Sequence, residues 1–182
     1  SLKLDLWATK GNTSVTDQGQ SDDVYWTTRS FENTPLLKWP SHVAIALSVI
    51  GSAIDNNTVS LAPGKKVYIT LTLNTNFDHK DWKAASIKTA KELNTAKIAT
   101  LFKAHEKWWS DFWAKSSIHI PDTILEKYYY ASQYLFASSS AAAKFAPGIW
   151  GPFITKDSAA WGGDYHLNYN YQAPYWASYA SN

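Results

Sequence analysis

The sequence predicts a mixed fold in which β-strands come first and α-helices follow. Apolar and polar residues alternate with a period of two along 43–49 and 67–73, as in half-buried strands. Turn-forming residues lie between these strands at 55–57 and 63–64. From about residue 78 the apolar residues recur instead at the 3.6-residue spacing of a helix. The chain is therefore expected to be β in its first part and α in the remainder.

Residues 1–77 are expected to form part of a β-sandwich. Further strands are predicted around 2–7 and 24–31, and a short one at 59–61. Several short strands with turns at this spacing are typical of a sandwich. They are too few for a large one, so this segment is expected to be only a portion.

Residues 78–119 are expected to form a helical linker with a break near Asn94, a suitable cap for a second helix. In the first helix Trp82, Ala85 and Ala90 share one face. The second carries a broad apolar stripe made of Ile98, Leu101, Phe102, His105, Trp108, Trp109 and Phe112. His105 lies on this stripe, and Trp109 stands where a zinc protease motif would have its second His. We therefore interpret His105 as a packed residue rather than a metal ligand.

Residues 120–182 are expected to begin with another helix. Thr123 and Glu126 match a capping box, in which the hydroxyl and the carboxylate each bond a free backbone N–H. Small residues at 137–143 would allow close helix packing, and the pair at 147–148, Pro and Gly, would end the helix.

Composition excludes several classes of protein. The formal net charge is only +2 and the lysines are scattered, which disfavours nucleic acid as the main partner. The longest apolar run, 43–54, is too short to span a bilayer. There is no Cys, which excludes disulfides and Cys-based zinc sites. There is also no Met, so the chain is expected to be part of a longer polypeptide.

Aromatic residues are abundant, with ten Trp and eleven Tyr. Their flat apolar faces and polar edges suit stacking on sugar rings, but the same side chains also fill ordinary protein cores. Composition alone favours the second interpretation.

Polar and aromatic residues alternate along 164–172. Residues two apart share a face in an extended segment but not in a helix, so this segment is predicted to be extended. Its polar face would then display a carboxylate, an imidazole and neutral amides, which suit sugar hydroxyls or a held water better than a metal. An edge strand with its polar face in solvent explains the pattern equally well. The polar residues are Asp164, His166, Asn168, Asn170 and Gln172.

The C-terminal part resembles glycoside hydrolase family 95 and its close relatives. The resemblance covers about residues 100–182 and rests on the letters PGIW at 147–150, WGGDYHLNYN at 161–170 and YW at 175–176. It implies an (α/α)6 barrel whose start, 120–182, is present here, preceded by a linker and a β-sandwich. It also implies inverting hydrolysis of terminal α-L-fucosyl or related sugars on an oligosaccharide or glycan, with no cofactor and no metal.

The resemblance also implies roles for individual residues. Asn168 and Asn170 match the two asparagines that hold and polarise the attacking water together with a carboxylate. That carboxylate and the general acid are expected on later helices, in the remainder of the same polypeptide. The usual substrates imply an extracellular or periplasmic location. The sugar is expected to be bound by Trp161, Asp164, Tyr165, His166, Gln172 and Trp176.

One departure from the family pattern and two other functions stay open. Residues 172–174, Gln-Ala-Pro, replace an acidic residue, Met and Asn, so the substrate contacts there are expected to differ. A non-catalytic carbohydrate-binding protein would use the β-segment and the aromatic residues instead. A barrel glycoside phosphorylase would share the domain order but require phosphate.

Overall fold

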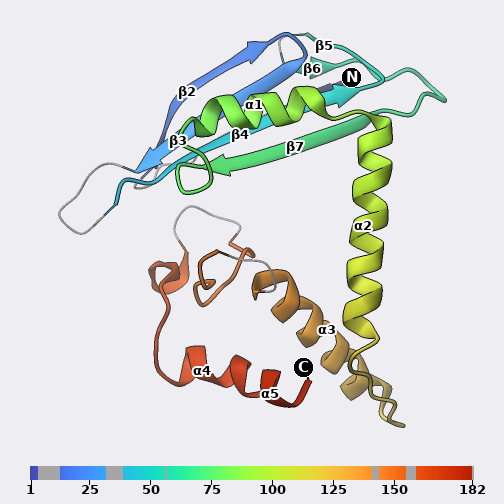
Figure 1. The fold of residues 1–182 in the computed structure, drawn as a ribbon, viewed down its shortest axis with the longest axis vertical. Coiled ribbons are helices and arrows are strands. Elements are labelled where there is room, and N and C mark those ends of the chain that lie inside the picture. The colour runs from blue at the N-terminus through green and yellow to red at the C-terminus, as the bar shows by residue number, and fades with distance from the viewer. Residues whose placement is uncertain (4–12, 32–38, 56, 141–143, 155–158, 182) are drawn as a thin grey trace. The chain divides into compact units, whose positions relative to one another are not determined.

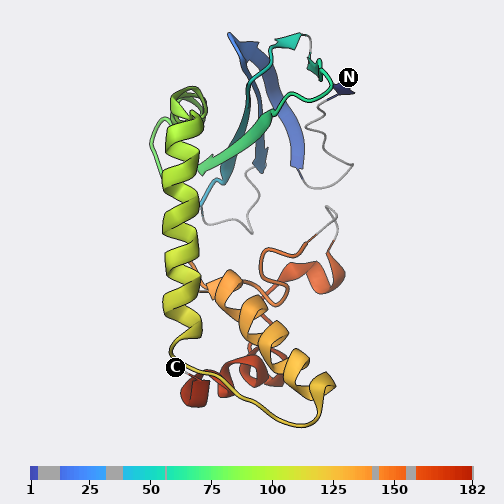
Figure 2. The ribbon, with the colours of Figure 1, turned by 90° about the vertical axis from the view of Figure 1, so that its right-hand side faces the viewer.

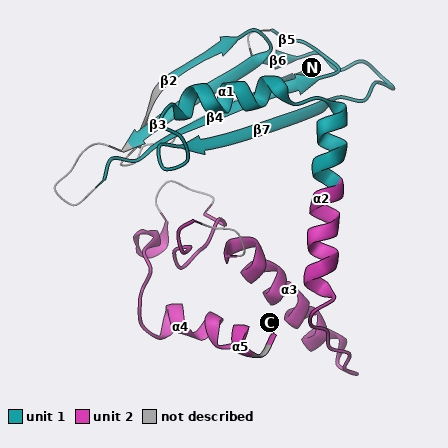
Figure 3. Ribbon diagram, viewed as in Figure 1, with its two compact units in different colours: residues 1–102 teal, residues 103–182 magenta. Residues whose placement is uncertain are grey.

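The chain forms two units, residues 1–102 and residues 103–182 (Figure 3). In this computed structural model every strand among the described residues precedes the first helix, which confirms the predicted order of β before α. The helix α2 (Thr95–Trp113) begins in the first unit and ends in the second. The structure describes residues 1–3, 13–31, 39–55, 57–140, 144–154 and 159–181.

The main sheet of the first unit has four antiparallel strands in the order β2-β3-β4-β7 (Figures 1 and 2). They are β2 (Thr13–Ser21), β3 (Val24–Phe31), β4 (His42–Ile50) and β7 (Tyr68–Thr75). A smaller sheet joins three two-residue strands in the order β1-β6-β5: β1 (Leu2–Lys3), β6 (Thr58–Val59) and β5 (Ile54–Asp55).

The strands predicted at 24–31, 43–49 and 67–73 are confirmed as β3, β4 and β7. The strand predicted around 2–7 is observed at Leu2–Lys3, and the rest of that range lies outside the described residues. The prediction for 59–61 is met only in part, because β6 ends at Val59. The strand β2 was not predicted, since its mostly polar sequence has no apolar alternation.

On β7 the covered face is the polar one. Thr72 Oγ1 donates to the Ser86 carbonyl at 2.9 Å, and Asn74 Nδ2 donates to Ser86 Oγ at 3.0 Å. The opposite face is apolar and largely exposed, with Ile69 at 44%, Leu71 at 58% and Leu73 at 55% exposure. The predicted alternation is therefore present, but hydrogen bonding rather than apolar burial holds this strand to its helix.

The helix α1 (Trp82–Glu92) packs on this face of β4 and β7. Small buried residues on both sides, Ala46 on β4 and Ala90 on α1, let the two backbones approach closely. Ser86 Oγ donates to the Ala44 carbonyl and Ser48 Oγ donates to the Ala90 carbonyl, each at 3.0 Å. Polar groups buried at this contact are thus paired, as burial requires.

Ion pairs join α1 to the β2–β3 hairpin. Lys83 Nζ lies 2.7 Å from Asp17 Oδ2 and 3.5 Å from the centre of a Trp26 ring. Lys91 Nζ lies 2.7 Å from Asp22 Oδ2. The hydrogen bond from Lys83 holds the pKa of Asp17 below its usual value. Both pairs are exposed, so they contribute little to stability compared with the buried contacts.

The predicted break near Asn94 is confirmed, because α1 ends at Glu92 and α2 begins at Thr95. Asn94 Oδ1 accepts a bond from the Lys97 N–H at 3.0 Å. The predicted capping box at Thr123 is wrong by one residue. The helix α3 (Thr123–Ser140) is capped by Asp122, whose Oδ1 accepts from the N–H groups of residues 124 and 125 at 2.9 and 3.1 Å. Glu126 accepts instead from the Ile120 N–H at 2.9 Å, ahead of the helix.

Within the second unit an aromatic cluster joins the end of α2 to α3. Trp109 stacks on Trp113 and on Tyr134, with ring centres 5.5 and 5.0 Å apart. Trp108 stacks on Phe112 at 5.5 Å. Such pairs stabilise beyond the area they bury. The apolar stripe predicted for α2 thus contacts α3 through its C-terminal aromatic residues.

The remainder of the second unit contains a 3-10 turn, η1 (Ala160–Gly163), and two short helices, α4 (Tyr169–Trp176) and α5 (Ser178–Ser181). Of the helices that the structure describes, none has both the length and the apolar character that a membrane span needs.

Candidate functional site

The prediction that the whole segment 164–172 is extended is wrong. Its second half belongs to α4, and Asn168 is the residue that caps this helix, with its Oδ1 accepting from the Asn170 N–H at 3.4 Å. Asparagine is among the strongest N-cap residues, and its capping bond competes with a strand ladder. The polar side chains of 164–172 therefore do not share one face.

The residues ahead of α4 form a turn that brings three predicted binding residues together. Trp161 and His166 have positive φ angles of 54° and 43°. The two rings stack with their centres 5.0 Å apart. The Asp164 carboxylate bonds the imidazole Nδ1 of His166 and accepts from its backbone N–H at 3.1 Å. His166 is thereby oriented with Nε2 as its remaining polar atom.

The loop 146–151 is held against residues 160–171 by four hydrogen bonds. Two come from tyrosine hydroxyls, one from an indole N–H and one from the backbone. The bonds are Tyr165 Oη to the Ala146 carbonyl (2.9 Å), Tyr171 Oη to the Pro147 carbonyl (3.0 Å), Trp150 Nε1 to the Ala160 carbonyl (2.9 Å), and the Ile149 N–H to the Asp164 carbonyl (2.9 Å).

Two glycines allow the close approach of this loop. A Cβ on Gly148 would lie 2.6 Å from the Gly163 carbonyl oxygen, which is backbone and cannot turn aside. A Cβ on Gly151, which has a φ of +55°, would lie 2.6 Å from Ser139 Oγ on α3. Residues 147–150 therefore belong to a loop that packs closely against α3 and the 160–164 segment.

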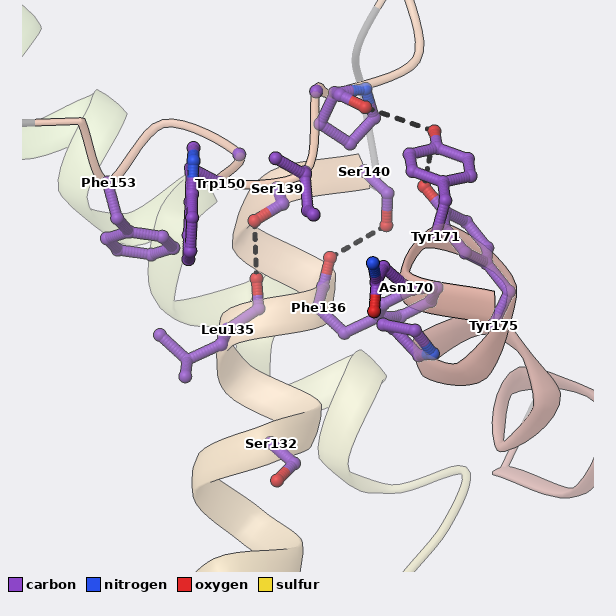
Figure 4. A pocket seen from close by; sticks show the side chains of 15 residues that line it. Ser132, Leu135, Phe136, Ser139, Ser140, Trp150, Phe153, Asn170, Tyr171 and Tyr175 are labelled. Atoms are coloured by element: carbon purple, nitrogen blue, oxygen red, sulfur yellow. Dashed lines mark hydrogen bonds between the residues drawn. The ribbon is translucent and has the colours of Figure 1, made fainter. Parts of the chain in front are cut away.

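A cavity of about 660 Å³ lies between α3, this loop and α4 (Figure 4). Its volume is in the range of small-molecule sites. Asn170 contributes an amide to its wall, and Ser139 and Ser140 contribute hydroxyls. The apolar and aromatic part of the wall includes Leu135, Phe136, Ile149, Trp150, Phe153 and Tyr175.

Of the eight site residues that the sequence predicts, Asn170 is the one that lines this cavity. Trp161 stacks on Trp150 of the cavity wall, with ring centres 5.7 Å apart, and so lies next to it. Gln172 and Trp176 are exposed on α4. Tyr165 uses its hydroxyl to hold the loop.

Sequence reasoning missed Tyr171 and Tyr175, which lie one turn apart on α4 and face the cavity. Their spacing of four residues is the helical signal that could have revealed them. The hydroxyl oxygens are 3.1 Å apart. Burial, aided by the Tyr175 hydroxyl, raises the pKa of Tyr171 to about 12. Tyr171 therefore stays protonated, and able to donate to Pro147, at any physiological pH.

Replacing Tyr171 by Phe is expected to lower the free energy of unfolding at pH 8 by about 1 kcal/mol, because the ring stays and the two hydrogen bonds are lost. The raised pKa means that the hydroxyl stabilises the fold fully below about pH 10, and that this contribution is lost as the pH rises through about 12. Urea denaturation at pH 8 and pH 11 should thus give a smaller difference at pH 11. Tyr128→Phe, at an exposed position of α3, is the control. Equal differences at the two pH values would contradict this role.

No carboxylate is found among the described residues that line the cavity. The described part of the chain also holds no group of three His, Asp or Glu residues able to bind a metal ion. The cavity itself therefore offers amide and hydroxyl groups set in an apolar wall, a combination suited to holding a neutral polar ligand.

Comparison with known proteins places these residues in a family. The model of the glycosyl hydrolase family 95 catalytic domain matches residues 74–182. A probable alpha-fucosidase A of Aspergillus niger is 44% identical over 45 residues, which are 25% of this chain and 6% of the fucosidase. The match thus spans only a small part of that relative's length. No solved structure matches the chain.

Proposed function

Because this chain belongs to glycosyl hydrolase family 95, we propose that it is part of an enzyme that hydrolyses terminal α-L-fucosyl or related sugars from glycans, with inversion. The observation that carries the proposal is the cavity between α3, the loop 146–151 and α4, which has Asn170 in its wall. A polar group next to aromatic faces is the arrangement that sugar binding needs.

The proposed reaction requires a held water on one side of the sugar and an acid on the other. We assign the water to Asn170 at the cavity and to Asn168, whose side-chain oxygen caps α4 and whose amide NH2 can still donate. An amide cannot take up a proton at neutral pH, so a carboxylate must act as the base. Since the described lining of the cavity contains none, base and acid are proposed to come from the remainder of the polypeptide.

The proposed sugar-binding residues are assigned different roles. Trp161 and His166, stacked on each other and oriented by Asp164, are proposed to bind the edge of the sugar next to the cavity. Tyr165 contributes indirectly by holding the loop. Gln172 and Trp176, which are exposed on α4, are proposed to contact the glycan beyond the terminal sugar.

The apolar wall supports a 6-deoxy sugar as the substrate. L-Fucose carries a methyl group where L-galactose carries a hydroxymethyl group, and a hydroxyl buried against apolar side chains loses its bonds to water. We therefore expect kcat/KM for an α-L-fucoside to exceed that for the matching α-L-galactoside by about 10²-fold.

Hydrolysis of 4-nitrophenyl α-L-fucopyranoside and of 4-nitrophenyl α-L-galactopyranoside by the full-length protein tests both the activity and this preference. Proton NMR of the first product, before mutarotation, should show the β-anomer. Lack of fucoside hydrolysis, with cleavage only when phosphate is added, would indicate a phosphorylase. Glycan binding by residues 1–77 without any cleavage would instead favour the carbohydrate-binding function.

The domain organisation proposed for the parent enzyme follows the same family. The main sheet is proposed to be one layer of a β-sandwich (1–77), with 78–119 as the linker and 120–182 as the first part of an (α/α)6 barrel. Because glycans of this kind are mostly outside the cytoplasm, an extracellular or periplasmic location is proposed, to be checked by cell fractionation.

A further inference from the structure

Pro174 lies in the interior of α4, at the sixth of its eight positions. Proline has no backbone N–H, so it cannot donate the helical hydrogen bond to the carbonyl four residues earlier, and its ring pushes that carbonyl away from the helix axis. The carbonyl concerned belongs to Asn170. The sequence thus removes a helical donor from the residue to which we assign the attacking water.

Asn170 and Pro174 both line the cavity. Residues four apart lie one above the other on a helix, so the stretch of α4 surface between them borders the same space. A helical carbonyl points along the axis towards the residue four positions later. The Asn170 carbonyl is thus directed towards Pro174, which also lines the cavity.

Three of the hydroxyl groups that line the cavity donate to other carbonyls. Ser139 Oγ donates to the Leu135 carbonyl and Ser140 Oγ to the Phe136 carbonyl, both at 2.7 Å. The Tyr171 hydroxyl donates to the Pro147 carbonyl at 3.0 Å. Because Asn170 is exposed, water can donate to its carbonyl in the free protein, and a ligand that carries hydroxyl groups can take the place of that water.

We infer that the main-chain carbonyl of Asn170, released by Pro174, accepts a hydrogen bond from a hydroxyl of the bound sugar. One residue then binds twice: its side-chain amide holds the water and its carbonyl holds the sugar, which fixes the distance between them. Pro174 is a positioning residue in this arrangement, because it acts through the Asn170 carbonyl. The inference rests on the proposed function and goes beyond it by assigning a substrate contact to the backbone.

The test compares three forms of the full-length protein. Pro174→Ala removes the ring and restores the N–H that can bond the Asn170 carbonyl. Incorporating lactic acid at position 174 removes the ring but gives an ester, which restores no N–H. Alanine is the better helix former, so loss of the fold is not expected for Pro174→Ala.

Pro174→Ala should raise KM for 4-nitrophenyl α-L-fucopyranoside about tenfold and change kcat little, since the lost contact is one neutral hydrogen bond to the substrate. The ester form should keep a KM close to the wild-type value. An unchanged KM in Pro174→Ala overturns the inference. An equally raised KM in both forms also overturns it, because the ring would then be the cause.

Calorimetric titration of the same three proteins with L-fucose separates this inference from the proposed function. If the wild-type protein binds fucose but cleaves no fucoside, the proposed hydrolase function is refuted. The inference about the Asn170 carbonyl still stands in that case if Pro174→Ala binds fucose more weakly and the ester form does not. A wild-type protein that neither binds fucose nor cleaves the fucoside overturns both.

Discussion

Replacing Asn170 by Ala in the full-length protein is expected to lower kcat by about 10²–10³-fold, the effect of removing one polarising group from a reaction centre. The side chain lines the cavity and makes no contribution to the apolar core, so the fold should persist. The decrease should appear in kcat and kcat/KM alike, because the water is held most strongly in the transition state. Steady-state kinetics with 4-nitrophenyl α-L-fucopyranoside and a circular dichroism spectrum measure the two quantities.

Gln133→Ala is a matched control for this experiment. It removes an amide from α3, the helix that forms the other side of the cavity, at a position that is not part of the cavity lining. Its kcat should stay within about twofold of wild type, in line with the small effects of most changes away from a site. Near-normal turnover in Asn170→Ala would refute the role assigned to this residue.

Replacing Trp109 by Ala is expected to lower the free energy of unfolding of the second unit by about 3 kcal/mol. This half-buried side chain contacts Trp108, Phe112, Trp113 and Tyr134, with ring centres 4.8 to 5.5 Å apart. Truncation leaves a gap between α2 and α3 and removes the aromatic pairs. Urea denaturation followed by circular dichroism measures the loss without relying on tryptophan fluorescence.

Tyr128→Ala serves as the comparison for Trp109→Ala. Tyr128 is an aromatic residue of α3 that is 68% exposed, so its truncation should change stability by no more than about 0.5 kcal/mol. Similar losses in the two variants would mean that the aromatic cluster does not hold the helices together.

The elements with a long, regular period could be predicted from the sequence. The alternation at 43–49 and 67–73 gave β4 and β7, and Asn94 marked the break between α1 and α2. Local signals were enough there because many residues agree on one period. The packing of α1 on the polar face of β7 could not be predicted, since it depends on hydrogen bonds to Ser86, a residue of α1.

The candidate site was predicted less well, and the reason is again physical. Alternating Tyr and Asn residues have poor helix propensity, and Pro174, two residues beyond, normally argues against a helix, so the period-two alternation of 164–172 was interpreted as extended. Two hydrogen bonds favour the helix instead: a tertiary bond from the Tyr171 hydroxyl to the Pro147 carbonyl and the local cap that Asn168 provides. Asn170 was predicted as a site residue from family resemblance and lines the cavity, and its role in catalysis stays a prediction.

The apolar row on β7 has a consequence for handling the first unit in isolation. Among the described strands β7 ends the main sheet, so one side of its backbone has no strand partner there. Its core letters, ITLTL at 69–73, carry no charge and no proline, and such an edge readily pairs with copies of itself. Lys65 and Lys66 stand just before the strand, where like charges hinder stacking of identical chains. Residues 1–102 produced alone should therefore stay dispersed at low ionic strength and precipitate as salt screens these lysines.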